Sequence, residues 1–308
     1  MSTPQAGIFA LGTASHAYLE FDIKSGVEAQ DLVAAVAGLR EPRTTMGGVN
    51  LVAGFRPELW QSVAPDQSPD GIDGFNQEIA GTENFKIPAT QHDAVLWISG
   101  SAYDVVFDVS RQAIAALEKL ARVAEETSSW PYHHDRDLTG FIDGTENPTL
   151  IDAPGIALIP EPEKGSGGSV LLLQKWIHDA VAWESLGIPR QEMVIGRTKL
   201  DSVELENRPA DSHAARTDQD DFGKIFRRNM PYGTVTGHGT MFVGFSAEQR
   251  RMVRMLESMA GLKDGVRDAL TYFATPLTGS YYFVPSISDF VGGSAPARAQ
   301  VRAAARQA

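Results

Sequence analysis

The strongest constraint on the fold is a pattern that occurs twice, an apolar strand followed closely by an amphipathic helix. Residues 94–99 (AVLWIS) are continuously apolar up to the final serine, and residues 103–126 carry the apolar stripe of a long helix. Residues 241–245 (MFVGF) lead in the same way into a second helix, whose face includes Met252 and Met259. Each strand and helix must bury its apolar face against another layer, so the repetition predicts a duplicated α+β unit.

Further elements fit the same order in each half. Residues 18–23 (YLEFDI) alternate like a half-buried strand, and residues 27–39 have the spacing of a helix. Residues 50–55 and 170–176 (VLLLQKW) are two more expected strands. The pattern therefore predicts an α+β protein whose two halves follow a similar plan.

The second long helix has recognisable end signals. Ser246 is expected to cap its beginning, with Gln249 in the capping-box position three residues later. Gly261 is expected to end it, because glycine readily adopts the left-handed conformation after a helix.

Composition excludes several classes of function. The 308 residues are 43% hydrophobic, which allows a large core in one or two domains. A net charge of −12 argues against a nucleic-acid partner, and the absence of cysteine excludes disulfides, thiolate ligands and a cysteine nucleophile. No run approaches the roughly 18 apolar residues of a membrane span, and no signal peptide is evident. We therefore expect a cytoplasmic protein.

The histidines offer two ligand hypotheses. His213 lies in the small, polar segment DSHAARTD, where a surface or capping residue is the simpler interpretation and a metal ligand the alternative. His133 and His134 could form a metal site with Asp135 and Asp137, although a solvated turn is the simpler and preferred interpretation of the run HHDRD.

The segment GFIDGTENP places Asp143 between Gly140 and Gly144. Asp-Gly is a common turn dipeptide, so Asp143 could simply cap a turn. Alternatively, the two glycines could let the backbone approach a flat, bulky ligand. The residues alone leave both interpretations open.

The segment FRRNMPYG has the alternation of an extended chain. Arg227 and Asn229 then share one face, and Arg228 points to the other. Arg197 adds a cation in the polar loop GRTK, which is unremarkable by itself.

Four segments together resemble one family. GFIDGTENP, GRTKLDSVEL, DSHAARTD and IFRRNMPYG occur in the order and spacing of dye-decolorizing peroxidases, and the chain is similar to the compact bacterial members from about residue 6 to residue 292. The resemblance implies two ferredoxin-like halves, residues 1–145 and 146–294, with one haem b between a distal and a proximal wall. Residues 295–308 (APARAQVRAAARQA) match no motif of the family.

The resemblance also implies residue roles. His213 matches the proximal ligand of the haem iron, Asp143 the distal acid–base residue, and Arg227 the distal arginine, with Asn229 beside it. Arg197 matches a position that contacts a haem propionate.

A proximal histidine usually donates its free N–H to an acceptor, often a carboxylate, and two aspartates are candidates for this partner of His213. Asp268 is expected in a helix just before LTYFATPLTGSYYF, and Asp289 is expected in a turn after the strand at residues 280–284. The family match favours Asp268.

These roles imply a haem-dependent peroxidase that reduces hydrogen peroxide and oxidises organic donors, dyes and phenols included, by one-electron steps. The alternatives are a haem-binding or haem-handling protein with incidental peroxidase activity, and a haem-free binding module. An acid paired with an arginine favours the enzyme, because storage needs neither. The expected partners are peroxide and small organic reductants. The family also implies a homo-oligomer and, for some relatives, an encapsulating shell protein.

Overall fold

The computed structural model describes residues 2–39, 48–133 and 135–293, and their main strands divide into two groups along the chain. The first group comprises β1 (Ser15–Ile23), β2 (Val49–Phe55), β5 (Ala94–Gly100) and β6 (Ala121–Ser129). The second group comprises β7 (Ser169–His178), β8 (Phe226–Arg227), β9 (Met230–Gly233), β10 (His238–Ser246), β11 (Ala274–Pro276) and β12 (Ser280–Val284).

Both groups are antiparallel and have the same internal order. The first runs β6-β1-β5-β2, and four strands of the second run β9-β10-β7-β12. Counted along the chain among these four strands, the first strand of each group lies between the third and the fourth. Single residue pairs join the groups at both edges, Phe283 with Phe55 and Ser129 with Tyr232. The strands therefore close into one continuous sheet.

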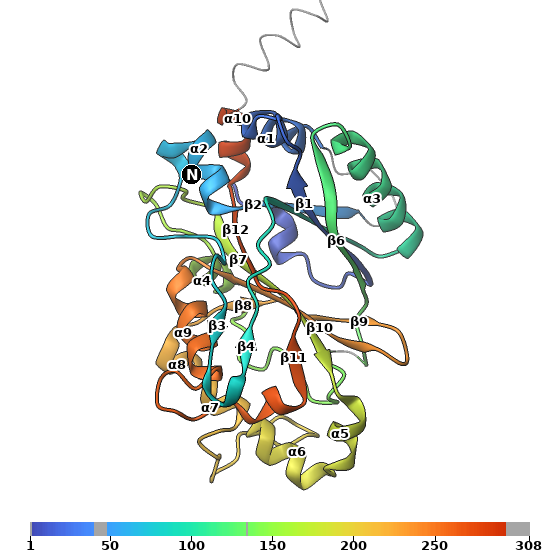
Figure 1. The fold of residues 1–308 in the computed structure, drawn as a ribbon, viewed down its shortest axis with the longest axis vertical. Helices are drawn as coiled ribbons and strands as arrows, with labels where there is room; N and C mark the ends of the chain where they lie inside the picture. Colours follow the sequence, from blue (N-terminus) through green and yellow to red (C-terminus); the bar gives the residue numbers. More distant parts are fainter. Residues whose placement is uncertain (1, 40–47, 134, 294–308) are drawn as a thin grey trace, which may run out of the picture.

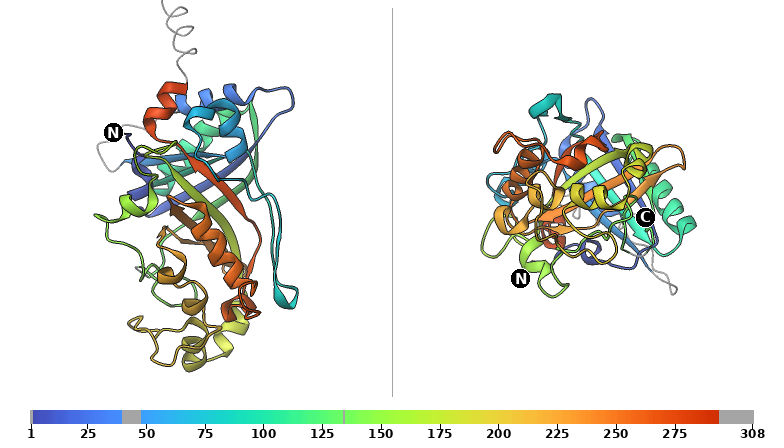
Figure 2. Two further views of the ribbon diagram at one scale, coloured as in Figure 1. Left: turned by 90° about the vertical axis from the view of Figure 1, so that its left-hand side faces the viewer. Right: turned by 90° about the horizontal axis from the view of Figure 1, so that it is seen from below.

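Helices cover the outer face of each group. α1 (Ala29–Gly38), α2 (Pro57–Val63) and α3 (Tyr103–Leu117) pack on the first group, and α9 (Gln249–Met259) packs on the second (Figure 2). The remaining helices are short: α4 (Ala153–Ala157), α5 (Ala180–Ser185), α6 (Ile188–Ile195), α7 (His213–Arg216), α8 (Gln219–Phe222) and α10 (Ile287–Gly293).

A hairpin from the first half reaches the second. β3 (Ile79–Ala80) and β4 (Lys86–Ile87) run alongside α9 (Figure 1), and the 3₁₀ turn η3 (Thr82–Asn84) joins them. The backbone N–H of Thr82 donates to the carbonyl of Ala260 at 2.9 Å, just after α9 ends. The two halves are therefore joined by this hairpin as well as by the two strand pairings of the sheet.

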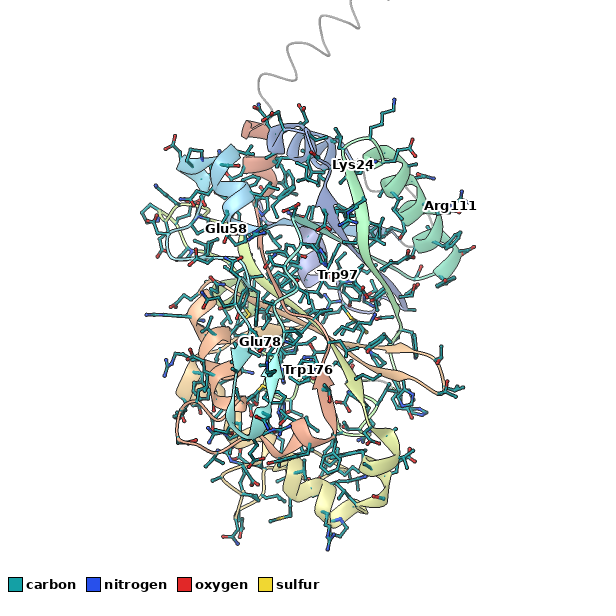
Figure 3. The ribbon with its side chains drawn as sticks, in the orientation of Figure 1. Lys24, Glu58, Glu78, Trp97, Arg111 and Trp176 are labelled. Atoms are coloured by element: carbon teal, nitrogen blue, oxygen red, sulfur yellow. The ribbon has the colours of Figure 1, made fainter. Side chains whose placement is uncertain are left out.

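Strand alternation divides the interior into layers. On β1, Leu19 and Phe21 face the helices of the first half, whereas Tyr18 faces the space enclosed by the sheet. Trp97 of β5 lies in that enclosed layer, near the middle of the molecule (Figure 3). A third apolar layer lies between β7 and α9 and includes Leu172.

Two local expectations were wrong. The helix expected at residues 103–126 ends at Leu117, and residues 121–129 form β6, which pairs with β1 along its length. The pairing with β1 outweighs the helical spacing of the apolar residues, which continues past Leu117. Ser246 does not cap α9, because its hydroxyl bonds to the backbone of Glu248, which is the N-cap residue.

Two other expectations have simpler outcomes. Gly261 follows α9 with a φ of +76°, in the left-handed region expected after a helix. Residues 295–308 lie outside the described residues. Within the described part of the chain, no helix is long and apolar enough to cross a membrane.

The contact between β7 and β10 depends on a glycine. A Cβ built on Gly239 would lie 1.8 Å from the carbonyl oxygen of Trp176, whereas one on Gly237 would meet nothing within 4 Å. Gly239→Ala should therefore push the two strands apart and lower the free energy of unfolding by about 1–3 kcal/mol or more. Gly237→Ala should change it by no more than about 0.5 kcal/mol. Urea unfolding checks this, and equal midpoints for the two variants would contradict it.

Candidate functional site

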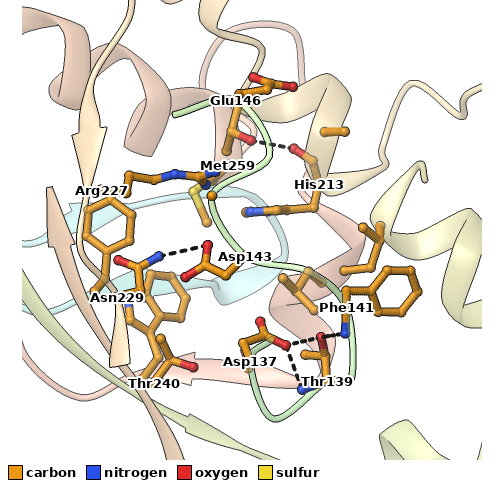
Figure 4. A pocket seen from close by; sticks show the side chains of 18 of the residues that line it. Asp137, Thr139, Phe141, Asp143, Glu146, His213, Arg227, Asn229, Thr240 and Met259 are labelled. Carbon is orange, nitrogen blue, oxygen red and sulfur yellow. Dashed lines mark hydrogen bonds between the residues drawn. The ribbon is translucent and has the colours of Figure 1, made fainter. Parts of the chain in front are cut away.

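A large cavity lies in the second half of the molecule, between the outer sheet face and α9. About 1310 Å³ is free of atoms, its open mouth included. Apolar residues form much of its lining: Phe141, Leu172, Trp176, Ile225, Phe242, Met252, Met255, Leu256, Met259 and Leu270. Its polar residues come from a few places, chiefly the loop of residues 137–146, the start of α7, and the connection between β8 and β9 (Figure 4).

His213 stands on one wall as the first residue of α7. Its Nδ1 lies 2.7 Å from Oδ2 of Asp268, whose side chain is fully buried. The other oxygen of Asp268 accepts the backbone N–H of Leu270 at 2.8 Å, which fixes the carboxylate at the start of the turn η4 (Ala269–Tyr272). The carboxylate accepts a hydrogen bond from Nδ1–H of His213, and Nε2 is left for the cavity.

The electrostatics of His213 follow from this pair. Burial lowers the pKa of His213, but the charge and hydrogen bond of Asp268 raise it more, so that the pKa lies above the usual value. In the haem-free protein Asp268 therefore favours the protonated form of the imidazole.

Asp143, Arg227 and Asn229 converge on the opposite side (Figure 4). Asn229 donates from Nδ2 to Oδ1 of Asp143 at 3.3 Å, and its own carbonyl oxygen accepts the N–H of Val243 at 2.9 Å. The amide of Asn229 is thus oriented by the sheet and in turn orients the carboxylate of Asp143.

Arg228 points away from the cavity, as the alternation predicts. Its guanidinium donates to the carbonyl of Ile8 at 3.0 Å and lies over the ring of Trp97, 5.1 Å from the centroid. Burial lowers the pKa of Arg228 to about 10, so it remains a cation at neutral pH.

The glycines beside Asp143 have a local purpose. Gly140 and Gly144 have φ values of +85° and +78°, where a side chain would be strained. A Cβ on Gly140 would lie 2.7 Å from Cε of Lys199, and one on Gly144 would lie 3.0 Å from the amide of Asn147. The glycines therefore make room for neighbouring side chains, and the expectation that they also let the backbone approach a flat ligand stays a prediction.

Asn147 was not singled out from the sequence. Its Oδ1 accepts the backbone N–H of Arg227 at 2.8 Å, and its Nδ2 donates to the carbonyl of Arg227 at 2.9 Å. This amide attaches the loop that carries Asp143 to the strand that carries Arg227. An asparagine before a proline is typical of turns, so the local pattern did not indicate the contact.

Asp137 also lines the cavity. Its carboxylate accepts the backbone N–H of Thr139 at 2.8 Å and the hydroxyl of the same residue. Burial, together with the charge of Asp143, raises the pKa of Asp137 to about 6. The cavity thus contains a second carboxyl group that holds its proton more tightly than an ordinary aspartate.

Arg197 lines the cavity but is already paired. It donates to the carbonyl of Ser202 at 3.0 Å, bonds to Glu146, and lies 3.5 Å from Glu204. A haem propionate at this position would have to share Arg197 with the two glutamates, so the expected contact stays a prediction.

The other candidates lie elsewhere. Asp289 is in α10, which packs against α1, and its N–H bonds to Ser286. No group of three His, Cys, Asp or Glu residues suited to a metal ion occurs in the described part of the chain, and His134 of the HHDRD hypothesis lies outside it.

Comparisons with known proteins agree along nearly the whole chain. The model for the N-terminal part of Dyp-type peroxidases matches residues 5–130, and the model for the C-terminal part matches residues 134–289. The chain belongs to the Dyp-type peroxidase family. It is therefore a haem peroxidase.

Individual relatives cover most of the chain. A dye-decolorizing peroxidase of Mycolicibacterium paratuberculosis is 34% identical over 275 residues, 86% of this chain and 76% of the relative. One from Rhodococcus erythropolis is 33% identical over 294 residues, 91% of this chain and 85% of the relative.

Solved structures are equally similar. A dye-decolorizing peroxidase from Bacteroides thetaiotaomicron superposes with a TM-score of 0.86 at 29% identity, covering 95% of this chain and 98% of the other. A variant of a Rhodococcus jostii RHA1 protein in complex with heme superposes with a TM-score of 0.83 at 31% identity, covering 93% and 97%.

The cavity fits a haem. An imidazole fixed through one nitrogen can offer the other to iron, and the apolar lining suits a macrocycle. Nε of Arg227 is buried and has no hydrogen-bond partner among the described residues, so this side of the cavity retains an unused donor.

Asp137 makes the stability of the haem-free peroxidase depend on pH. Its pKa is about 6 in the folded protein against 3.8 for an ordinary aspartate, so folding favours the protonated form and stability is lost as the pH rises from about 4 to 6. Asp137→Asn keeps an acceptor for Thr139 but cannot ionise. Chemical denaturation measures the free energy of unfolding. From about pH 4 to pH 6 this free energy should rise in the variant relative to the wild type, by up to about 3 kcal/mol. A pH-independent difference would contradict the assignment.

Proposed function

We propose that this protein reduces hydrogen peroxide and oxidises small organic donors, dyes and phenols among them, by one-electron steps at a haem b. One observation supports this proposal most directly. On one wall of the cavity the imidazole of His213 bonds to the buried carboxylate of Asp268, and the opposite wall carries Asp143 and Arg227. When bound, the haem supplies an iron that binds peroxide and takes up its oxidising equivalents.

His213 is the ligand of the haem iron in this proposal. Asp268 holds the Nδ1 proton, which fixes the tautomer and makes Nε2 a stronger donor. The proton stays at Nδ1, and the imidazole gains anionic character from its buried partner. This favours the oxidised state of the iron.

Asp143 is the acid–base residue. It removes the proton from one oxygen of peroxide and returns it to the oxygen that leaves as water. Asn229 holds the carboxylate through one oxygen, at 3.3 Å, and leaves the other for this proton transfer.

Arg227 acts by charge. A guanidinium does not act as a proton shuttle in proteins, so Arg227 cannot carry the proton in place of Asp143. It stabilises the negative charge that develops on the departing oxygen. Asn147 sets its backbone position from the Asp143 loop, so the acid and the cation move together.

The proposal also covers the duplication of the fold, a contact between Arg197 and the haem, and the assembly of the protein. The shared strand order of the two groups supports a duplicated ferredoxin-like unit, with halves at residues 1–145 and 146–294. The match of GRTKLDSVEL supports a contact between Arg197 and a haem propionate. The family resemblance supports a homo-oligomer and, as for some relatives, an encapsulating shell protein as a partner. We also propose a cytoplasmic location.

A haem-handling protein is the alternative function. Such a protein needs His213 to bind the haem iron, but it does not need an acid–base residue such as Asp143 together with a cation such as Arg227. That acid–guanidinium pair therefore favours the enzyme.

The distal residues should act on peroxide and not on haem binding. Asp143→Asn and Arg227→Leu should retain haem and react with peroxide more slowly, by about 10²–10⁴-fold for the acid–base residue. Stopped-flow mixing of the holoprotein with peroxide measures this.

Two comparisons make that experiment decisive. Arg228→Leu alters the neighbouring arginine, which lies on the other face, and should react at the wild-type rate. His213→Ala should instead lose the haem absorption spectrum. Wild-type rates in both distal variants would support the haem-handling alternative.

The buried partner of His213 should set the reduction potential. Asp268→Asn weakens the anionic character of the imidazole, so it should raise the Fe(III)/Fe(II) potential measured by spectroelectrochemistry. Asp289→Asn is the matched control, and its potential should equal that of the wild type. A shift in the control but not in Asp268→Asn would transfer the role to Asp289.

A further inference from the structure

Arg136 joins two loops that meet at the cavity. One of its terminal nitrogens donates to the carbonyls of Gly140 and Lys199, at 2.8 and 2.9 Å. The other donates to the carbonyl of Leu200 at 2.9 Å. Gly140 belongs to the loop that carries Asp143, whereas Lys199 and Leu200 belong to the segment that begins at Arg197.

The backbone of Arg136 strengthens the same connection. It forms an isolated β-bridge with Ile142, the residue before Asp143. The preceding residue, Asp135, contributes as well, because its backbone carbonyl accepts the N–H of Asp143 at 2.6 Å. The backbone at residues 135–136 thus holds the Asp143 loop directly, and the side chain of Arg136 ties that loop to its neighbour.

The charge of Arg136 is committed to these carbonyls. Among the described residues, no carboxylate lies within 4.0 Å of its guanidinium, in contrast to Arg197 and Arg208 nearby. Hydrogen bonds from a cation are stronger than those between neutral groups, and the planar guanidinium can reach three acceptors at fixed angles. A lysine could not reproduce this set.

We propose that Arg136 is a positioning residue of the peroxidase reaction, which fixes the Asp143 loop against the Arg197 segment and thereby holds the carboxylate of Asp143 in its place in the cavity. The proposal rests on the proposed role of Asp143. It also implies that the edge of the cavity at Arg197 and the acid are mechanically coupled, because one side chain bonds to both loops.

A purely structural arginine would behave differently. It would lower stability without acting through Asp143. A displaced acid instead loses proton transfer specifically, and a misplacement of about 1 Å can cost about 10²-fold in rate. Two measurements separate these cases.

The first measurement is hydrogen exchange of the amides at residues 141–144, in protein without and with haem. Arg136→Gln should exchange there about 10-fold faster or more, because local opening becomes easier. Arg136→Lys should fall between it and the wild type. Arg208→Gln is the matched control, because Arg208 lies in the same segment and its guanidinium pairs with Glu204 and Asp218 and with no carbonyl of the Asp143 loop among the described residues. Unchanged exchange in both Arg136 variants would overturn the proposal.

The second measurement is the rate of reaction with peroxide in a double-mutant cycle. Arg136→Gln should slow the native holoprotein by about 10–100-fold. On the Asp143→Asn background the same substitution should cost no more than about 3-fold, because residues that act as a unit are not additive. An equal loss on both backgrounds would show that Arg136 acts independently of Asp143 and overturn the proposal.

The two measurements also distinguish this proposal from the proposed function. If Asp143→Asn alone reacts at the wild-type rate, the assignment of the acid fails, and with it the role of Arg136 in catalysis. Hydrogen exchange then still reports whether Arg136 holds the loop.

Discussion

The rest of the structure depends on β7 serving two layers at once. Its odd-numbered apolar residues, Leu171 and Leu173, pack inside the closed sheet, and Leu172 and Trp176 face the cavity. On one edge β7 pairs with β10, and on the other it pairs with β12 and then β11. A strand held on both edges and packed on both faces makes a rigid floor. The cavity can therefore be large without the sheet collapsing into it.

The functional groups above this floor come mainly from irregular segments, so their positions depend on specific hydrogen bonds. Asn147 joins the Asp143 loop to Arg227, Asn229 joins Asp143 to β10, and Arg136 joins the loop to the segment of Arg197. Each is a polar side chain that bonds to backbone. Such contacts fix a loop in space without covering the side chains that must meet a ligand.

Three carboxyl groups in or beside the cavity are placed in different environments. Asp268 is fully buried but bonded to His213 and to a backbone N–H. Asp137 is bonded to Thr139 and lies near the like charge of Asp143, which contributes to its raised pKa of about 6. Asp143 bonds to the neutral amide of Asn229. Side chains of the same chemical type can perform different tasks in one pocket when their hydrogen-bond partners and neighbouring charges differ.

Local sequence patterns determined much of the fold and the identity of several site residues. The pattern at residues 18–23 and the apolar runs at residues 94–99 and 241–245 correctly predicted strands. The expectation that residues 18–23 are half-buried was wrong, because β1 is buried on both faces over residues 15–21, between the helices of the first half and the interior of the closed sheet. Alternation in FRRNMPYG likewise separated Arg227 from Arg228.

Contacts between distant segments decided the rest. Residues 121–129 became a strand only because β1 offered a partner, and the sheet closed through two residue pairs that no local pattern encodes. His213 and Asp268 are 55 residues apart, and Asn147 and Arg227 are 80 apart. The type of a residue states which bonds it can make. Only the tertiary fold, by bringing two segments within about 3 Å, decides which of those bonds form.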